Sequence, residues 1–255
     1  MSRFAGKVVL CAGSATGIGA ITAQKLGREG AKVVLGDLNL AGAQKVIDQI
    51  VADGGEGVAV EFDIAEPESV QALVTKAVEY FGGLDLMHVN ATDRRLNRQD
   101  FDAVTTDLAV FDRLHTVSLR GHLLCTRFAI PEILKRGGGA IVYTSSDAGK
   151  APANARMSYG IAKAGLNALM RHVAYRWGRE GLRANAVSPG ITVTDAMIGN
   201  TTEEERAEMG KAVPSKRLGT PTDIAALVTF LLSDEAEWIN GQAISINGGK
   251  LMAIG

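Results

Sequence analysis

Short apolar runs alternate along the whole chain with longer segments of helical periodicity. The strand-like runs start near Val8, Val33, Val58, Leu84, Ala140, Ala184 and Ala243. Strands separated by helices are joined by right-handed crossovers, and the helices then cover both faces of a parallel sheet. The pattern therefore predicts one doubly wound α/β domain over residues 1–255 with a seven-stranded parallel sheet. Ligands are expected at the carboxyl ends of its strands.

The first apolar run leads directly into a glycine-rich turn. Residues 7–12 read Lys-Val-Val-Leu-Cys-Ala, and the sequence Gly13-Ser-Ala-Thr16-Gly17-Ile18-Gly19 follows at the start of a helical segment. Glycines permit a tight turn and let backbone N–H groups approach a pyrophosphate, which the positive end of the helix then holds. The order of strand, turn and helix predicts a Rossmann-like dinucleotide site to which these five numbered residues contribute.

The second strand ends at Asp37, eighteen residues after Gly19. An acidic side chain at this distance can accept hydrogen bonds from both hydroxyls of an adenosine ribose. The carboxylate would repel a 2′-phosphate, and neither Thr16 nor Leu38 is a cation that could offset the repulsion. We therefore expect the cofactor to be NAD rather than NADP.

A Tyr-x-x-x-Lys pair, Tyr159 and Lys163, lies in an apolar helical stretch, and Ser146 ends a strand-like run. Residues four apart share a helix face, so the Lys163 ammonium can stabilise the Tyr159 phenolate and lower the tyrosine pKa from its reference value of about 10. Ser146 can donate a hydrogen bond to a substrate oxygen. The three residues indicate carbonyl–alcohol redox chemistry, although Tyr-x-x-x-Lys also occurs by chance on solvated helix faces.

Together these features resemble the short-chain dehydrogenase/reductase family, in its single-domain Rossmann-fold branch. The resemblance covers nearly the whole chain, because further motifs follow in the family's order. These are Asp63 after the third strand, Asn90-Ala91 after the fourth, Pro189-Gly190, and Asn247-Gly-Gly249 near the end.

The resemblance also implies a role for each matching residue. Asp63 and Ile64 would bracket the adenine, and Asn90 would support the backbone on the cofactor side. Tyr159 would be the acid/base, Ser146 would orient the substrate, and Lys163 would also hold the nicotinamide ribose. The segment 188–194 would wrap the nicotinamide, using Pro189, Gly190, the Ile191 backbone and the Thr194 hydroxyl.

The largest departure from the family's pattern is Ser118, where the family usually carries an asparagine. That asparagine holds a water that links the active-site lysine to solvent. Serine is shorter, but its hydroxyl can donate and accept, so a second water can restore the relay. We therefore count Ser118 with the catalytic residues and expect slower rather than abolished turnover. Ala12 and Thr92 replace the family's usual Thr and Gly and should adjust hydrogen bonding in their turns.

Composition narrows the function further. The chain has 255 residues, 46% of them hydrophobic, and a net charge of −1. A chain of this length and hydrophobic content can bury one full core. The net charge provides no field that would attract nucleic acid. A membrane helix needs about 18 consecutive apolar residues, and no segment reaches that length. The residues before the first strand are too few for a secretory signal. A cytoplasmic location is therefore expected. Cys11 and Cys125 fit buried hydrophobes, and the scattered histidines predict no metal site.

Substrate specificity is expected in three segments, residues 93–101, 148–158 and 195–216, because loops often carry function. Residues 201–206 look like a capped helix, which we interpret as a lid over the substrate. Arg94, Arg95 and Arg98 could bind a carboxylate or phosphate of the substrate, although a solvated basic loop is the simpler interpretation.

The sequence as a whole predicts an NAD-dependent dehydrogenase of a secondary alcohol such as a sugar, polyol, steroid or hydroxy acid. A 3-oxoacyl thioester reductase would use the same residues, but such enzymes normally prefer NADP, which Asp37 disfavours. An NAD(H)-binding sensor or scaffold whose proton relay decayed at Ser118 is a second alternative. The family resemblance further implies a homotetramer assembled through the helices of residues 109–136 and 157–179.

Overall fold

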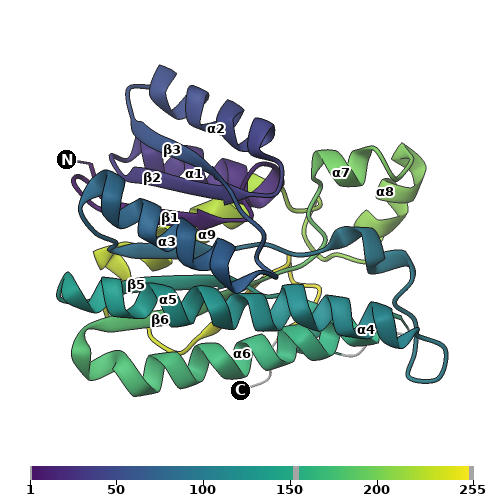
Figure 1. Ribbon diagram of the computed structural model, residues 1–255. Coiled ribbons are helices and arrows are strands. Elements are labelled where there is room, and N and C mark those ends of the chain that lie inside the picture. Colours follow the sequence, from purple (N-terminus) through teal and green to yellow (C-terminus); the bar gives the residue numbers. More distant parts are fainter. Residues whose placement is uncertain (1, 152–154, 253–255) are drawn as a thin grey trace.

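A parallel sheet runs through the centre of the computed structural model, which describes residues 2–151 and 155–252 (Figure 1). In the described chain the sheet has seven strands in the order β3-β2-β1-β4-β5-β6-β7. The predicted doubly wound α/β fold is confirmed. The strands are β1 (Val8–Ala12), β2 (Lys32–Asp37), β3 (Glu56–Glu61), β4 (Leu86–Val89), β5 (Gly139–Thr144), β6 (Leu182–Pro189) and β7 (Ala243–Ile246).

Helices cover both faces of the sheet (Figure 1). One layer contains α1 (Gly17–Arg28), α2 (Leu40–Ala52) and α9 (Pro221–Leu232). The other contains α3 (Pro67–Phe81), α4 (Leu108–His115), α5 (Gly121–Lys135) and α6 (Met157–Trp177). Val9 and Cys11 of β1 pack toward the first layer, whereas Val8 and Leu10 pack toward the second. Because both faces are buried, the strands are continuously apolar instead of alternating.

The strand order places the start of the chain at the centre of the sheet. The chain moves outward from β1 to β3 and then returns to form β4 on the other side of β1. A crevice opens at the carboxyl ends of two strands where the winding direction reverses in this way. The glycine turn after β1 and Asn90 after β4 lie at this switch point.

A single π-helical turn, Thr116–Arg120, joins α4 to α5 and contains Ser118. Such turns widen a helix locally and are frequent at functional sites. Four short 3₁₀ turns complete the helical structure of the described residues, at Arg94–Arg98, Asp147–Gly149, Gly178–Glu180 and Asp234–Ala236.

Two further helices follow β6, α7 (Asp195–Ile198) and α8 (Glu203–Lys211) (Figure 1). Thr202 caps α8 by accepting from the Glu205 backbone N–H, and the Glu205 carboxylate accepts from the Thr202 N–H in return. The capped helix predicted near residues 201–206 is therefore confirmed. Its role as a lid stays a prediction.

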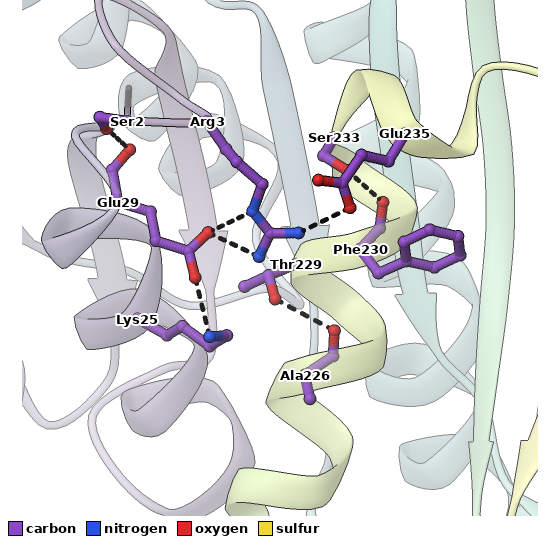
Figure 2. Close-up of polar contacts among 9 residues, drawn as sticks. All are labelled: Ser2, Arg3, Lys25, Glu29, Ala226, Thr229, Phe230, Ser233 and Glu235. Atoms are coloured by element: carbon purple, nitrogen blue, oxygen red, sulfur yellow. Dashed lines mark hydrogen bonds and ion pairs between the residues drawn. The ribbon is translucent and has the colours of Figure 1, made fainter.

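The amino terminus is tied to the helix layer of α1 and α9 by Arg3 (Figure 2). Its guanidinium pairs with Glu29 just after α1 at 2.6 Å and with Glu235 just after α9 at 3.2 Å. Lys25 pairs with the second Glu29 oxygen at 2.7 Å. These partly exposed pairs are individually weak, but they connect the first and last helices of the same layer.

Candidate active site

One cleft of about 880 Å³ borders the carboxyl ends of the strands. Its volume lies in the range of cofactor and substrate sites. All predicted site residues except Gly19 and Ser118 line it, namely Gly13, Thr16, Gly17, Ile18, Asp37, Asp63, Ile64, Asn90, Ser146, Tyr159, Lys163, Pro189, Gly190, Ile191 and Thr194. The fold thus gathers residues from six strand ends into one space.

The glycine turn passes very close to the end of β4. Gly13 has a φ of +77°, and a Cβ atom there would lie 2.5 Å from the Cα of Ala91, so only glycine fits. Asn90 donates from Nδ2 to the Gly13 carbonyl at 2.8 Å and holds the turn from the neighbouring strand. Gly19 lies buried behind the turn, where a Cβ atom would meet Ser14 Oγ at 2.5 Å. Its role is therefore close packing of the helix rather than lining of the cleft.

Backbone N–H groups fix the two acidic residues on this side of the cleft. Asp37 accepts from the Ala15 N–H and from the Asn39 N–H, both at 2.9 Å and on different oxygens. Asp63 accepts from the Ala65 N–H at 2.8 Å. Each carboxylate oxygen has a second lone pair, so the Asp37 carboxylate can accept further bonds from a ligand.

Ser146, Tyr159 and Lys163 line the opposite part of the same cleft. Ser146 follows β5, and its hydroxyl accepts from the Ala148 N–H at 3.2 Å, which orients the side chain at the start of a 3₁₀ turn. Tyr159 is the third residue of α6 and is nearly buried. The Lys163 ammonium lies 5.5 Å from the centre of the Tyr159 ring and donates to the Thr144 carbonyl at 2.7 Å. The predicted helix spacing therefore does bring the cation beside the ring.

The electrostatic state of Lys163 is unusual for a lysine. Burial, with a smaller contribution from the charge of Arg156, lowers the pKa of Lys163 from 10.5 to about 7. His122 on α5 is also buried, and its pKa is lowered by burial and by the charge of Lys163. The ammonium is thus held in an environment that favours proton release near neutral pH.

Ser118 lies behind the cleft and is fully buried. Its hydroxyl is 3.2 Å from that of Thr92, which itself lines the cleft directly after β4. The two residues that depart from the family's pattern at these positions are therefore hydrogen-bonded to each other. The contact was not foreseen, because Thr92 and Ser118 are far apart in the sequence.

Asp100 is a positioning residue that the sequence did not reveal. It is buried, and its carboxylate accepts from the Ser158 N–H at 3.0 Å and from the Tyr159 N–H at 2.9 Å. These are two of the otherwise unpaired N–H groups at the start of α6. Asp100 thus caps the helix and fixes the Tyr159 backbone, from 59 residues upstream.

Arg156 is a second residue that the sequence analysis missed. It lines the cleft directly before α6, and its Cζ lies 4.5 Å from the centre of the Tyr159 ring. Among the described side chains, Tyr159 therefore has two cations close to its ring, Arg156 before it in the sequence and Lys163 after it.

The predicted arginine cluster after β4 is partly neutralised. Arg95 binds both oxygens of buried Asp93 at 2.8 and 2.9 Å, and this pair holds the pKa of Asp93 below its usual range. Arg98 donates to the Asn200 carbonyl at 3.2 Å. The side chain of Arg94 lies outside those that the structure describes. The role of these arginines in substrate binding stays a prediction.

The final part of the cleft comes from the end of β6. Gly190 lies so close to Asn247 that a Cβ atom would meet the Asn247 Cβ at 2.6 Å. Asn247 in turn donates to Asp147 at 2.8 Å, which joins the end of β7 to the turn after Ser146. Thr194 caps α7 by accepting from the Met197 N–H at 3.3 Å.

Within residues 2–151 and 155–252, no three histidine, cysteine or carboxylate side chains are grouped as ligands of a metal ion. Over the same part of the chain, no helix combines the length and the apolar character needed to cross a bilayer.

Comparison with known proteins gives a consistent result. Residues 12–250 match the family model described as enoyl-(acyl carrier protein) reductase. A probable short-chain type dehydrogenase/reductase of Bradyrhizobium diazoefficiens is 40% identical over 251 residues, which are 98% of this chain and 89% of that protein. Cyclohexanol dehydrogenase of an Acinetobacter species is 38% identical over 250 residues, 97% of this chain and 96% of that protein.

The fold also matches solved structures. The structure of a 7α-hydroxysteroid dehydrogenase with NADH and 7-oxo glycochenodeoxycholic acid superposes with a TM-score of 0.91 at 30% identity. The match covers 97% of this chain and 96% of the other.

Proposed function

This chain belongs to the short-chain dehydrogenase/reductase family, and we propose that it interconverts a secondary alcohol and a ketone, with NAD as cofactor and Tyr159 as acid/base. The observation that carries the proposal is the placement of Ser146, Tyr159 and Lys163 in the same cleft as the glycine turn at Gly13. The cyclohexanol and hydroxysteroid dehydrogenases among its relatives support a small alcohol or ketone as substrate.

The residues of the cleft fit a dinucleotide. Helix α1 starts at Gly17, and its N-cap residue Thr16 makes no side-chain capping bond, so the first N–H groups of the helix are available to a phosphate. A Cβ atom on Gly17 would lie 3.5 Å from the Thr194 side chain and would add bulk beside the start of α1, and the φ of Gly17, +57°, also favours glycine. Gly13, Gly17 and the start of α1 would therefore hold the pyrophosphate of NAD, and Asp37 its adenosine ribose.

The residues at the other end of the cleft would handle the substrate. A bound NAD would supply the acceptor for the hydride that leaves the carbinol carbon of the alcohol. The Ser146 hydroxyl donates a hydrogen bond to the substrate oxygen, and the Tyr159 oxygen takes the hydroxyl proton as the C–O bond becomes a carbonyl. Lys163, anchored on the Thr144 carbonyl, supplies positive charge beside the tyrosine. Ketone reduction reverses each transfer.

The preference for NAD rests on Asp37 at the end of β2. A phosphate on the ribose 2′ oxygen would lie against this carboxylate, and we expect kcat/KM to favour NAD over NADP by about 100-fold. Asp37→Asn keeps the shape of the side chain but removes its charge. It should reduce the preference to about tenfold, chiefly by improving NADP. An unchanged preference in Asp37→Asn would remove Asp37 from the argument.

The test of the whole proposal is NADH production over a panel of secondary alcohols, with NADP in parallel and Tyr159→Phe as the control. Tyr159→Phe should bind NADH like the parent and lose about 10²–10⁴-fold in kcat, because positioned acid/base groups contribute by that factor. Full turnover by Tyr159→Phe would disprove the assigned base. Tight NADH binding without turnover of any alcohol would favour the sensor or scaffold alternative.

The acyl thioester alternative also has an observation in its favour, since the matching family model carries an acyl-carrier reductase description. A 3-oxoacyl thioester therefore belongs in the panel together with NADPH. Faster reduction of the thioester with NADPH than of any ketone with NADH would favour that alternative.

Assembly as a homotetramer is part of the same proposal. Leu123 on α5, and Ile161 and Tyr175 on α6, are exposed on the two helices expected to meet a neighbouring subunit, whereas Met170 faces its own core. Light scattering at the mass of four chains, or of one, decides the point. We also propose the cytoplasm as its location, because a dissociable nicotinamide cofactor is drawn from the cell's own pool.

A further inference from the structure

Arg156 adopts a backbone conformation that its side chain disfavours. Its φ is +67°, and in the described chain every other residue with a φ in this region is glycine. The left-handed region brings the Cβ atom too close to the following carbonyl oxygen, so the surroundings have to impose it. The Arg156 N–H donates to the Asp100 carbonyl at 2.8 Å, and the next N–H, of Met157, donates to Phe101 at 3.2 Å. Such enforced strain clusters at functional sites.

The consequence of this conformation is the placement of the guanidinium. The Arg156 side chain lies over Tyr159, three residues later in the chain, and its Cζ is 4.5 Å from the centre of the tyrosine ring. No carboxylate among the described residues forms an ion pair with Arg156, and its buried Nε has no hydrogen-bond partner there. Within the described part of the chain, no neighbouring carboxylate therefore neutralises the positive charge, which lies over the ring.

We propose that Arg156 is a positioning residue that stabilises the Tyr159 phenolate from the face of its ring, as a second cation beside Lys163. The inference rests on the proposed role of Tyr159 as acid/base. Ionisation of a phenol spreads negative charge into the ring, so a cation over the ring face is attracted more strongly to the phenolate than to the phenol.

The state of Lys163 explains why a second cation is useful. Because burial lowers the pKa of Lys163 to about 7, part of its charge is lost as the pH rises above neutral. A guanidinium stays protonated throughout this range. Above neutral pH, where Lys163 loses part of its charge and alcohol oxidation needs the Tyr159 phenolate, Arg156 thus keeps a positive charge beside the ring.

Other charged groups around the cleft complete the local field. Asp100 caps α6 and His122 faces Lys163 from α5. The other charged side chains that line the cleft, among the described residues, are Asp37, Asp63, Asp93, Arg95, Arg113, Asp147, Asp195 and Lys250. Asp93 is paired with Arg95 and Arg113, so it does not neutralise Arg156.

The direct test is a spectrophotometric titration of Tyr159 in the purified protein. The chain has four tyrosines, so the tyrosinate absorbance of Tyr159 is isolated by subtracting a Tyr159→Phe variant of the same background. Arg156→Gln should raise the apparent pKa of this signal by roughly 1–2 units, because it removes a cation within about 4–6 Å. Arg156→Lys, which carries the same backbone strain and keeps the charge, should restore at least half of the shift. An equal apparent pKa in the parent and in Arg156→Gln overturns the inference.

A kinetic measurement separates this inference from the proposed function. For the best alcohol of the panel, Arg156→Gln should move the acidic limb of the kcat/KM profile upward by the same 1–2 units, for neutral and carboxylate-bearing alcohols alike. A higher KM confined to carboxylate-bearing alcohols, with the limb unmoved, would overturn the inference and assign Arg156 to substrate binding. If Tyr159→Phe kept full turnover, the proposed function would fail, whereas the titration would still report on the contact between Arg156 and Tyr159.

Discussion

Asp100 should decide both the stability of α6 and the position of Tyr159. Asp100 is 1% exposed, and its carboxylate accepts two backbone N–H groups, of Ser158 and Tyr159. In Asp100→Ala both groups lose their partner at the positive end of the helix. We therefore expect a loss of stability together with a loss of activity.

The magnitude follows from the two bonds. A hydrogen bond to a charged group contributes about 1.5–3 kcal/mol, so two would sum to about 3–6 kcal/mol. Water can enter the space left by the carboxylate and satisfy part of the exposed N–H groups, which brings the expected loss to about 3 kcal/mol. For a chain of this size each kcal/mol corresponds to about 2–4 °C in Tm, so Asp100→Ala should lower the Tm by about 6–12 °C.

The matched control is Asp107→Ala. Asp107 also caps a helix, α4, but it is exposed and accepts a single N–H, that of Ala109, at 2.8 Å. Its removal should cost about 1 kcal/mol, or about 2–4 °C, and leave kcat unchanged. The assays are thermal unfolding followed by circular dichroism, and kcat for the best alcohol. Equal Tm losses in the two variants, or an unchanged kcat in Asp100→Ala well below its Tm, would refute the role assigned to Asp100.

Two further predictions concern the proton path. Ser118 is fully buried and its hydroxyl contacts that of Thr92, so we expect the larger side chain of Ser118→Asn to be crowded. The double variant Thr92→Gly/Ser118→Asn should therefore raise kcat more than Ser118→Asn does. A lower kcat in both variants would show that the proton leaves by another route. The pKa of Lys163 is about 7 in the folded protein, below its ordinary value of 10.5. Between these two pH values the unfolded chain therefore binds more protons than the folded one. The free energy of unfolding of the parent should consequently rise with pH relative to that of Lys163→Met. Thermal unfolding of both proteins at pH 7 and pH 10 measures this difference, and parallel pH dependences would contradict the lowered pKa.

Local patterns in the sequence predicted most of the fold and most of the cleft lining. The reason is physical: buried parallel strands are continuously apolar, and a tight turn beneath a helix requires glycine at positions such as Gly13. Because the carboxyl ends of parallel strands meet at one edge, residues that follow different strands were expected to lie together. Asp37 and Ser146 needed no further information than their place after a strand.

The residues that escaped prediction act through tertiary contacts. Asp100 caps a helix that starts 57 residues later, and no short-range pattern connects the two. Arg156 occupies a left-handed conformation that the sequence would favour for glycine or asparagine, so its rotation over Tyr159 was invisible. For Gly19, the glycine pattern predicted that it belongs to the dinucleotide motif, but it did not predict that Gly19 packs behind the turn.

The order of the strands also determines when the cleft can be completed as the chain is synthesised. Asn90, just after β4, precedes Pro189, at the end of β6, by 99 residues, and both line the cleft. At a synthesis rate of about 5–20 residues per second, the nascent chain therefore spends roughly 5–20 s with half a cleft. During this time β4 forms the open edge next to β1 until β5 is added. The strand at the centre of the finished sheet is thus an exposed edge while the chain is still on the ribosome. A cofactor that needs both halves of the cleft can stabilise only a chain whose later strands have already covered this edge.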